Sequence, residues 1–202
     1  CPVYYATLAH SGYFPIEELK TLRKFGSRLQ GHPHREYLPL LENSSGPLGA
    51  GLSQAVGMAL ADRIDNGVSS DRQIYSLLSD GEHDEGQTWE AYLLAGKEKL
   101  QNLTVIIDRN NIQIDGFTEN IMPLEPFGDK LRAFGFHVQS IDGHNFESII
   151  EAIGMAQAEF SKPSAIIVNT IPGKGVKEFE RKYEWHGKPP NKEEADMALK
   201  EL

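Results

Sequence analysis

Two polar segments of this sequence are spaced so that they could bind a metal ion and a diphosphate. Ser79-Asp80-Gly81-Glu82 follows an apolar run at 74–78, and Asp108-Arg109-Asn110-Asn111 follows a second apolar run at 103–107. Both runs read as buried strands joined by one helix, so their carboxyl ends should meet at the sheet edge where ligands bind. Carboxylate and carboxamide oxygens suit Mg²⁺ or Ca²⁺, and Mg²⁺ is commonly bound together with phosphate groups.

Asp80 alone has a simpler interpretation, because an Asp after a strand often caps the next helix. Three features favour the metal instead. Gly81 lets a diphosphate approach the backbone closely, and a helix start at Glu85-Gly86 favours anionic groups. Asn110 offers a second side-chain oxygen from the neighbouring strand end, and Ile112 could add its backbone carbonyl. Two side-chain ligands at matched strand ends therefore predict a metal-diphosphate site.

The elements that position these residues alternate along most of the chain. We expect helices at 49–64, 85–99, 127–134 and 146–160, and strands at 74–78, 103–107, 137–141 and 165–170. This alternation predicts an α/β fold with a mainly parallel sheet and helices on both faces. Two further helical stretches are expected within residues 2–30, and the polar tail ends in a helix that starts at Asn191.

The bulk properties exclude several classes of function. The 202 residues suffice for one substantial domain, and no apolar run approaches the length of a membrane span. A net charge of −9 argues against a nucleic-acid partner. Cys1 is the single cysteine, which fits a reducing cytoplasm. We expect no signal peptide, and because Cys1–Ala6 reads as the middle of a helix, we expect further residues upstream.

The chain resembles the transketolase family through motifs that run in the same order over nearly its whole length. The matching segments are Leu29-Gln30-Gly31-His32-Pro33, Ser45-Gly46-Pro47-Leu48-Gly49, Asp80-Gly81-Glu82-His83-Asp84-Glu85-Gly86-Gln87-Thr88-Trp89-Glu90-Ala91, residues 108–116 and Trp185-His186-Gly187. Each segment alone is a weak signal. Together, with this order and spacing, they indicate the thiamine-diphosphate-binding fold, in the form of the diphosphate-binding domain.

The resemblance implies a thiamine diphosphate site that contains a metal ion. Asp80, Asn110 and the carbonyl of Ile112 would hold Mg²⁺ or Ca²⁺. The amide of Gly81 would face the diphosphate, and Glu82 belongs to the same cofactor-binding segment.

The resemblance also implies catalytic residues. His32 would lie near the reacting carbon, and His186 would reach the diphosphate or the substrate. Glu85 would join a proton relay across a subunit interface. The carbonyl of Gly46 would accept a hydrogen bond from the 4′-amino group of the cofactor, and Leu48 would support its ring. Without the resemblance, the two histidines would read as surface or packing residues and Glu85 as part of a helix start.

A complete transketolase has three domains, and this chain resembles only the first. We therefore expect residues 1–202 to form one diphosphate-binding domain, the N-terminal subunit of a split transketolase, that lacks a short upstream segment. A separate pyrimidine-binding subunit would complete the enzyme as a two-fold heterotetramer in the cytoplasm. The reaction would transfer a two-carbon ketol unit from a ketose to an aldose. The sequence leaves open which sugars or sugar phosphates are used.

Two alternatives remain open. The chain could belong to another thiamine diphosphate enzyme, such as a 2-oxoacid dehydrogenase α-subunit or a deoxyxylulose-phosphate synthase. The Gly31-His32-Pro33 loop and the Trp185-His186-Gly187 segment argue against both. The chain could also be a non-catalytic subunit that keeps the fold, and the presence of Asp80, Asn110 and His186 argues against that.

Overall fold

The chain divides into two compact units, residues 1–48 and 49–202. The structure is a computed structural model that describes residues 2–68 and 70–202, so Cys1 and Ser69 lie outside the described residues. Its elements in chain order are α1 (Pro2–His10), η1 (Ile16–Thr21), α2 (Ala50–Asn66), β1 (Ile74–Ser79), η2 (Gly81–Asp84), α3 (Gly86–Glu98), β2 (Leu103–Arg109), β3 (Ile112–Gln113), β4 (Gly116–Phe117), α4 (Thr118–Ile121), α5 (Phe127–Ala133), β5 (His137–Asp142), α6 (Phe146–Gln157), β6 (Ser164–Asn169), η3 (Tyr183–Trp185) and α7 (Lys192–Glu201).

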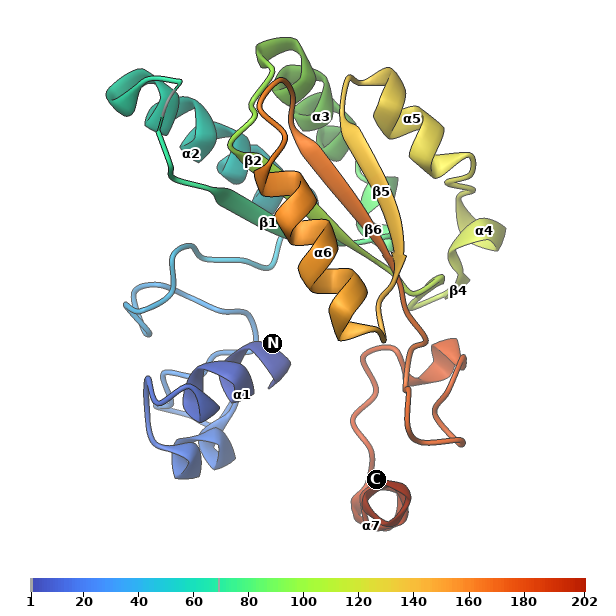
Figure 1. The fold of residues 1–202 in the computed structure, drawn as a ribbon. Coiled ribbons are helices and arrows are strands. Elements are labelled where there is room, and N and C mark those ends of the chain that lie inside the picture. Colours follow the sequence, from blue (N-terminus) through green and yellow to red (C-terminus); the bar gives the residue numbers. More distant parts are fainter. Residues whose placement is uncertain (1, 69) are drawn as a thin grey trace. The chain divides into compact units, whose positions relative to one another are not determined.

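The larger unit is built on a parallel sheet with the strand order β1-β2-β6-β5. Helices α2, α3 and α5 cover one face and α6 covers the other (Figure 1). The central strands β2 and β6 are buried almost continuously, because helices cover both of their faces. This confirms the predicted fold class, and the strands start and end within two residues of the predicted positions.

The main core lies between the sheet and α2, α3 and α5. It includes Leu52 and Val56 of α2, Tyr92 of α3 and Ile107 of β2, all of which are almost completely buried. A smaller cluster around Ile166 and Ala152 fills the space between the sheet and α6.

The smaller unit holds α1, η1 and a long irregular segment around its own core. Tyr5, Phe14, Leu29 and Leu38 are buried there, and the Tyr5 hydroxyl donates to the carbonyl of Gln30 over 2.9 Å. The second of the expected helical stretches is a short 3₁₀ helix, η1. Pro15 precedes it without a side-chain cap, so this segment has neither the length nor the capping of a stable α-helix.

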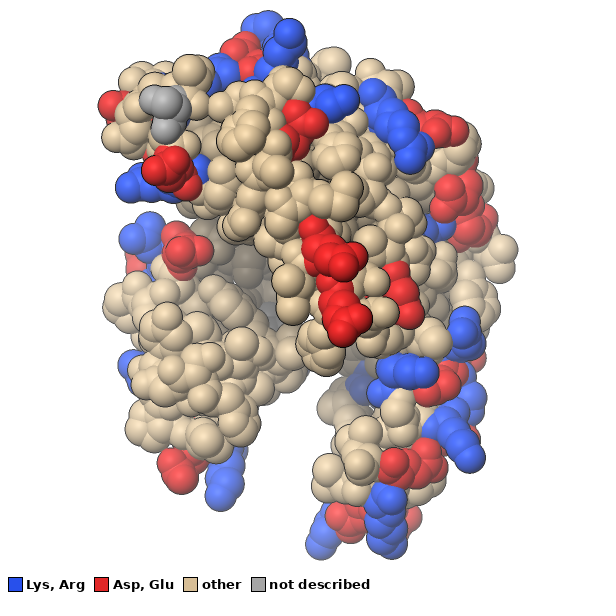
Figure 2. Space-filling model, in the orientation of Figure 1, with Lys and Arg blue, Asp and Glu red and all other residues tan. Residues whose placement is uncertain are grey.

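The charges on the surface do not form a nucleic-acid footprint on the face that Figure 2 shows. Lys and Arg side chains are interspersed there with Asp and Glu, and acidic side chains gather over α6, where Glu147 and Glu151 are exposed. Within the described part of the chain, no helix combines the length and apolar character needed to cross a bilayer.

Candidate metal and diphosphate site

Asp80 and Asn110 lie at the carboxyl ends of adjacent parallel strands. Ser79 of β1 is in register with Asp108 of β2, and the amide of Asp80 donates to the carbonyl of Asp108 over 3.1 Å. The two polar segments singled out in the sequence therefore meet at the edge of the sheet formed by the carboxyl ends of β1 and β2.

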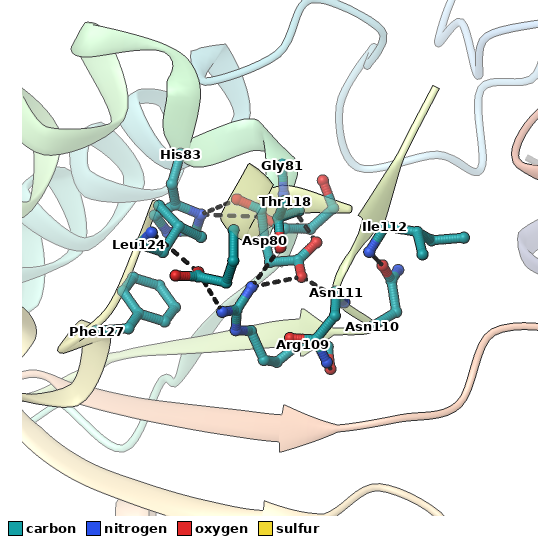
Figure 3. A network of polar contacts seen from close by, with 12 residues as sticks. Asp80, Gly81, His83, Arg109, Asn110, Asn111, Ile112, Thr118, Leu124 and Phe127 are labelled. Atoms are coloured by element: carbon teal, nitrogen blue, oxygen red, sulfur yellow. Dashed lines mark hydrogen bonds and ion pairs between the residues drawn. The ribbon is translucent and has the colours of Figure 1, made fainter. Parts of the chain in front are cut away.

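The Asp80 carboxylate is completely buried and accepts three hydrogen bonds (Figure 3). Its Oδ1 accepts from the Gly81 amide at 2.8 Å. Its Oδ2 accepts from the Asn111 amide at 2.7 Å and from Nη1 of Arg109 at 3.0 Å. Burial raises the pKa of Asp80 above its usual value, although these hydrogen bonds act in the opposite direction.

Asn110 and Ile112 belong to a tight turn that follows β2. The Asn110 side chain accepts from the Ile112 amide at 3.0 Å and donates to Oδ2 of Asp108 at 3.0 Å. Asn111 between them has a φ of 66°, a left-handed conformation that Asn tolerates better than most residues. Because the Asn111 amide also binds Asp80, the structure brings the predicted metal ligands Asp80, Asn110 and Ile112 to one place.

The donor set fits a hard cation. Among residues 2–68 and 70–202, no group of three or more His, Cys, Asp and Glu is arranged to hold a metal ion. A metal beside Asp80 would thus depend on one carboxylate together with carboxamide and backbone oxygens. Such oxygen donors are typical of Mg²⁺ and Ca²⁺ and unsuited to the softer transition metals.

Gly81 packs closely against Gln113, and a side chain at this position would force Gln113 to shift. A Cβ at this position would lie 2.9 Å from Oε1 and 3.2 Å from Cβ of Gln113 in β3. The absence of a side chain also leaves the start of η2 accessible to a phosphate group. Gly81 thus lies against the hairpin that follows the turn after β2, and its predicted contact with the diphosphate stays a prediction.

Glu82 has a structural function that the sequence did not indicate. Its buried carboxylate accepts from the Gly49 amide at 2.6 Å and from the Ser79 amide at 3.3 Å. It thereby links the start of α2 to the end of β1. The predicted contact of Glu82 with the cofactor stays a prediction.

Glu85 is exposed immediately before α3. Its backbone occupies the capping position of that helix, and its side chain makes no capping hydrogen bond. A carboxylate near a helix N-terminus is favourable even without a capping hydrogen bond. Because the Glu85 side chain is exposed, it is accessible to another subunit.

His186 follows η3 in the C-terminal segment and is exposed. This segment is fixed to the hairpin that follows Asn110, because the rings of Tyr183 and Phe117 meet edge to face with centroids 5.7 Å apart. Lys188 lies over the Trp185 ring at 4.0 Å. His186 is thus carried by a segment that packs against β4.

The other predicted residues lie in the smaller unit. His32 is exposed, and a Cβ on Gly46 would lie 3.1 Å from its Cγ, so these two residues are neighbours. Gly46 has a φ of 145°, which side chains rarely adopt. The Ser45 amide donates to the Pro33 carbonyl over 3.0 Å, which joins the two loops. Leu48 ends this unit with 52% of its surface exposed.

Two residues beside Asp80 were missed from the sequence. Arg109 is buried against Asp80. His83 is also buried, and its Nδ1 lies 3.0 Å from the Ser79 carbonyl and 3.1 Å from that of Asp80, while its Nε2 lies 2.8 Å from the Tyr92 hydroxyl. Nδ1 therefore donates and Nε2 accepts. Burial lowers the pKa of His83 to about 4.

Nothing in the sequence pattern marks Arg109. It ends a strand, where a charged residue usually faces solvent. His83 is a structural residue. Its position in the Asp80–Gly86 motif gave no sign that its ring is buried among Trp89, Tyr92 and Phe127.

Comparison with known proteins points to one family. A family model described as "Transketolase, thiamine diphosphate binding domain" matches residues 1–202. The "6-deoxy-6-sulfo-D-fructose transketolase subunit SqwG" of Clostridium sp. (strain MSTE9) is 46% identical over 201 residues, which are 100% of this chain and 72% of that protein. One of the subunits of the apulose-4-phosphate transketolase of Actinobacillus succinogenes is 40% identical over 98% of this chain and 71% of its own length.

A solved structure gives the same result for the fold. The transketolase of Campylobacter jejuni matches with a TM-score of 0.84 and 38% identity over 91% of this chain. The matched part is 29% of that transketolase chain. The resemblance expected from the five sequence segments is confirmed, and so is the thiamine-diphosphate-binding fold.

Proposed function

Since the chain belongs to the transketolase family as its thiamine diphosphate binding domain, we propose that Asp80 anchors the diphosphate of this cofactor through Mg²⁺ or Ca²⁺. One observation carries the proposal: the Asn111 amide binds the Asp80 carboxylate at 2.7 Å, so the turn with Asn110 and Ile112 faces the strand end that carries Asp80. Carboxylate, carboxamide and carbonyl oxygens are then available together.

The residues divide into those that hold the metal and those that hold the cofactor. Asp80, Asn110 and the carbonyl of Ile112 are the metal ligands of the proposal. The Gly81 amide, which in this structure donates to Oδ1 of Asp80, would face the diphosphate from the start of η2, and Glu82 supports this segment by accepting from the Gly49 and Ser79 amides.

The catalytic residues act on protons. Bound thiamine diphosphate supplies a carbanion and an electron sink for ketol transfer. His32 and His186 transfer protons to and from the sugar hydroxyls, because a histidine can donate and accept protons near neutral pH. Gly46 and Leu48 hold the ring of the cofactor through a carbonyl and an apolar contact, and Glu85 connects neighbouring active sites.

The enzyme would be completed by a second polypeptide. Relatives that align with nearly the whole chain are named as subunits of transketolases, and this chain would likewise act with a separate pyrimidine-binding subunit. Two copies of each subunit would form a two-fold heterotetramer in the cytoplasm. The family match argues against another thiamine diphosphate enzyme, and the presence of Asp80, Asn110 and His186 argues against a non-catalytic subunit.

The substrates would be a ketose donor and an aldose acceptor, as sugars or sugar phosphates. The names of the two relatives specify a sulfonated ketose in one case and a ketose phosphate in the other. Both compounds carry a terminal anionic group. They are therefore the first donors to assay with this chain and its partner.

Asp80→Ala and the isosteric Asp80→Asn test the metal site. In calorimetric titrations of thiamine diphosphate with Mg²⁺ into the complex of both subunits, each variant should lose most of the cofactor affinity, because the diphosphate is no longer neutralised. Asp84→Ala removes an exposed carboxylate from the same 3₁₀ helix and should bind as the wild type does. Wild-type affinity in a folded Asp80→Asn variant would refute the assignment.

A further inference from the structure

Arg109 is a buried cation in direct contact with the proposed metal ligand. Only 4% of its side chain is exposed, compared with 0% for Asp80. Its Nη1 donates to Asp80 at 3.0 Å and to the Thr118 hydroxyl at 2.8 Å, and its Nη2 donates to Glu119 at 2.6 Å and to Glu125 at 3.1 Å. A buried arginine with this many partners is fixed in position.

The carboxylates behind Arg109 are themselves anchored to the backbone. Oε1 of Glu119 also accepts from the Leu124 amide at 3.0 Å, and Oε2 of Glu125 accepts from the Phe127 amide at 2.8 Å. Glu119 and Glu125, in the segment that follows the β3–β4 hairpin, therefore hold Arg109 in position. Arg109 in turn fixes the Asp80 carboxylate at the end of β1.

The contacts make the two oxygens of Asp80 unequal. Oδ2 accepts from both Arg109 and the Asn111 amide, whereas Oδ1 accepts from the Gly81 amide alone. A cation would meet Oδ1, which accepts one hydrogen bond and keeps a free lone pair, and Oδ2, which already accepts two hydrogen bonds, one of them from a positive group.

We propose that Arg109 is a positioning residue that restricts Asp80 to metal ligation through Oδ1 and thereby favours Mg²⁺ over Ca²⁺, an inference that rests on the proposed function. Mg²⁺ demands short bonds in near-ideal octahedral geometry, while Ca²⁺ accepts higher coordination numbers and bidentate carboxylates. An Asp80 with both oxygens free would suit Ca²⁺ better. Partners outside the first coordination sphere commonly change metal affinity 10- to 100-fold.

The charge of the cluster agrees with this arrangement. Arg109 faces the carboxylates of Asp80, Glu119 and Glu125, which leaves an excess of negative charge beside the site. A divalent cation at Asp80 would balance that excess. Arg109 orients the carboxylate without cancelling its attraction for the metal.

The test measures metal preference in Arg109→Met and Arg109→Lys. Thiamine diphosphate binding to the complex of both subunits is followed by calorimetry while either Mg²⁺ or Ca²⁺ is titrated. We expect Arg109→Met to shift the ratio of the two metal affinities toward Ca²⁺ by about tenfold. The lysine of Arg109→Lys can reach Asp80 but cannot bridge all the partners of Arg109. The affinity ratio of this variant should therefore lie between those of Arg109→Met and the wild type.

The control is Arg63→Met, which removes an arginine that binds Glu98 elsewhere in the same unit and should leave the ratio unchanged. An equal loss of affinity for both metals in Arg109→Met would mean that the residue is only structural, and would overturn the inference. If Arg109→Met does not fold, Thr118→Val, which removes one anchor of Nη1, should show a smaller shift in the same direction, and no shift would overturn it. Failure of the wild type to bind thiamine diphosphate with either metal would instead refute the proposed function.

Discussion

His83 is kept neutral by its surroundings. Its ring is 2% exposed and is enclosed by Trp89, Tyr92 and Phe127. Its Nδ1 donates to carbonyls at the end of β1, and its Nε2 accepts from Tyr92. A protonated ring would have to bury its charge among these aromatic side chains. Burial therefore favours the neutral form of His83, although its hydrogen bonds to the carbonyls of Ser79 and Asp80 act in the opposite direction.

This neutrality makes stability depend on pH. The pKa of His83 is about 4 in the folded protein, whereas a histidine in the unfolded chain titrates near 6.5. Between these two pKa values the unfolded chain binds more protons than the folded protein. The contribution of neutral His83 to stability is therefore complete above about pH 6.5 and is lost as the pH falls through 4. The loss would reach about 3 kcal/mol.

Chemical denaturation of the isolated chain at a series of pH values measures this loss. The unfolding free energy of the wild type should decline between neutral pH and about pH 4. His83→Gln should lack the part of this decline that is due to protonation of His83. His10→Gln, which replaces an exposed histidine of α1, should keep the decline of the wild type. An identical pH dependence in His83→Gln and the wild type would contradict the assignment of a neutral His83.

The exposed histidines are expected to matter for turnover and not for stability. His32→Ala and His186→Ala should each lower ketol transfer by the reconstituted enzyme by about 10² to 10⁴, because general acid–base groups contribute that much to rate. Metal-dependent cofactor binding should change far less. His34→Ala, two residues from His32 in the same loop, is the matched control. Wild-type turnover in both variants would exclude a catalytic function for His32 and His186.

The sequence was sufficient to place Asp80, Asn110 and Ile112 together, because parallel strands must bring their carboxyl ends to one edge. It was not sufficient for Arg109, Glu82 or His83. Each has a neighbour from a distant segment: Glu82 binds Gly49, Arg109 binds Asp80, and the His83 ring contacts Phe127. Hydrophobic periodicity does not show which side chains meet across such distances. Which oxygen of Asp80 is free depends on those unpredicted contacts.

At the level of elements, α3 and α5 approach so closely that a glycine is required between them. A Cβ on Gly96 of α3 would lie 1.8 Å from the carbonyl oxygen of Phe134, the residue that caps the C-terminus of α5. The backbone of one helix thus fills the place of a side chain on the other. Since α3 also connects β1 to β2, its position sets the direction of the segment that contains Asp80.

Gly96→Ala should therefore destabilise the chain by about 3 kcal/mol, the upper part of the range for overpacked sites. Gly154→Ala serves as the control, because a Cβ on this exposed glycine of α6 meets nothing within 4 Å. That substitution should raise the unfolding free energy by up to about 1 kcal/mol through helix propensity. Urea denaturation compares the two, and equal stability of Gly96→Ala and the wild type would contradict the packing.

The predicted elements agree best with the structure where hydrophobic periodicity and turn residues mark the same boundary. The strands 74–78 and 103–107 are real and continue to Ser79 and Arg109, since pairing between parallel strands extends into the polar residues. The helix expected at 146–160 ends at Gln157. There the Glu159 carboxylate binds the amide of Ser161, which favours a turn, and such local side-chain bonds compete with a helix without leaving a periodic signal.

At the level of the whole molecule, α2 and α3 present apolar side chains that suit an interface with other subunits. Met58 on α2 and Leu93 and Leu94 on α3 are exposed in this chain. The two helices pack against each other, so their exposed residues belong to one side of the larger unit. We expect this surface to be covered in the assembled enzyme.

Leu93→Glu tests this expectation. Light scattering of the mixed subunits should give a complex of two copies of each for the wild type, and a smaller species for the variant, because a charge would have to be buried. Ile150→Glu changes an equally exposed residue on α6, on the opposite face of the sheet, and should assemble as the wild type does. Ketol transfer should follow assembly in each case. Robust turnover by this chain without a partner would contradict the proposed assembly.

The strand order has a consequence for how the chain folds during its synthesis. Among the described strands, β5 forms ladder hydrogen bonds only with β6, and β6 is also the neighbour of β2. β6 is the last strand of the sheet to be translated, yet it occupies an interior position between partners made earlier. On the ribosome, β1 and β2 can pair early, whereas β5 must wait until Asn169 has emerged. A nascent chain stopped shortly before Ser164 would carry β5 with both of its edges open, and chaperones or proteases that recognise unpaired strands would meet it in that state.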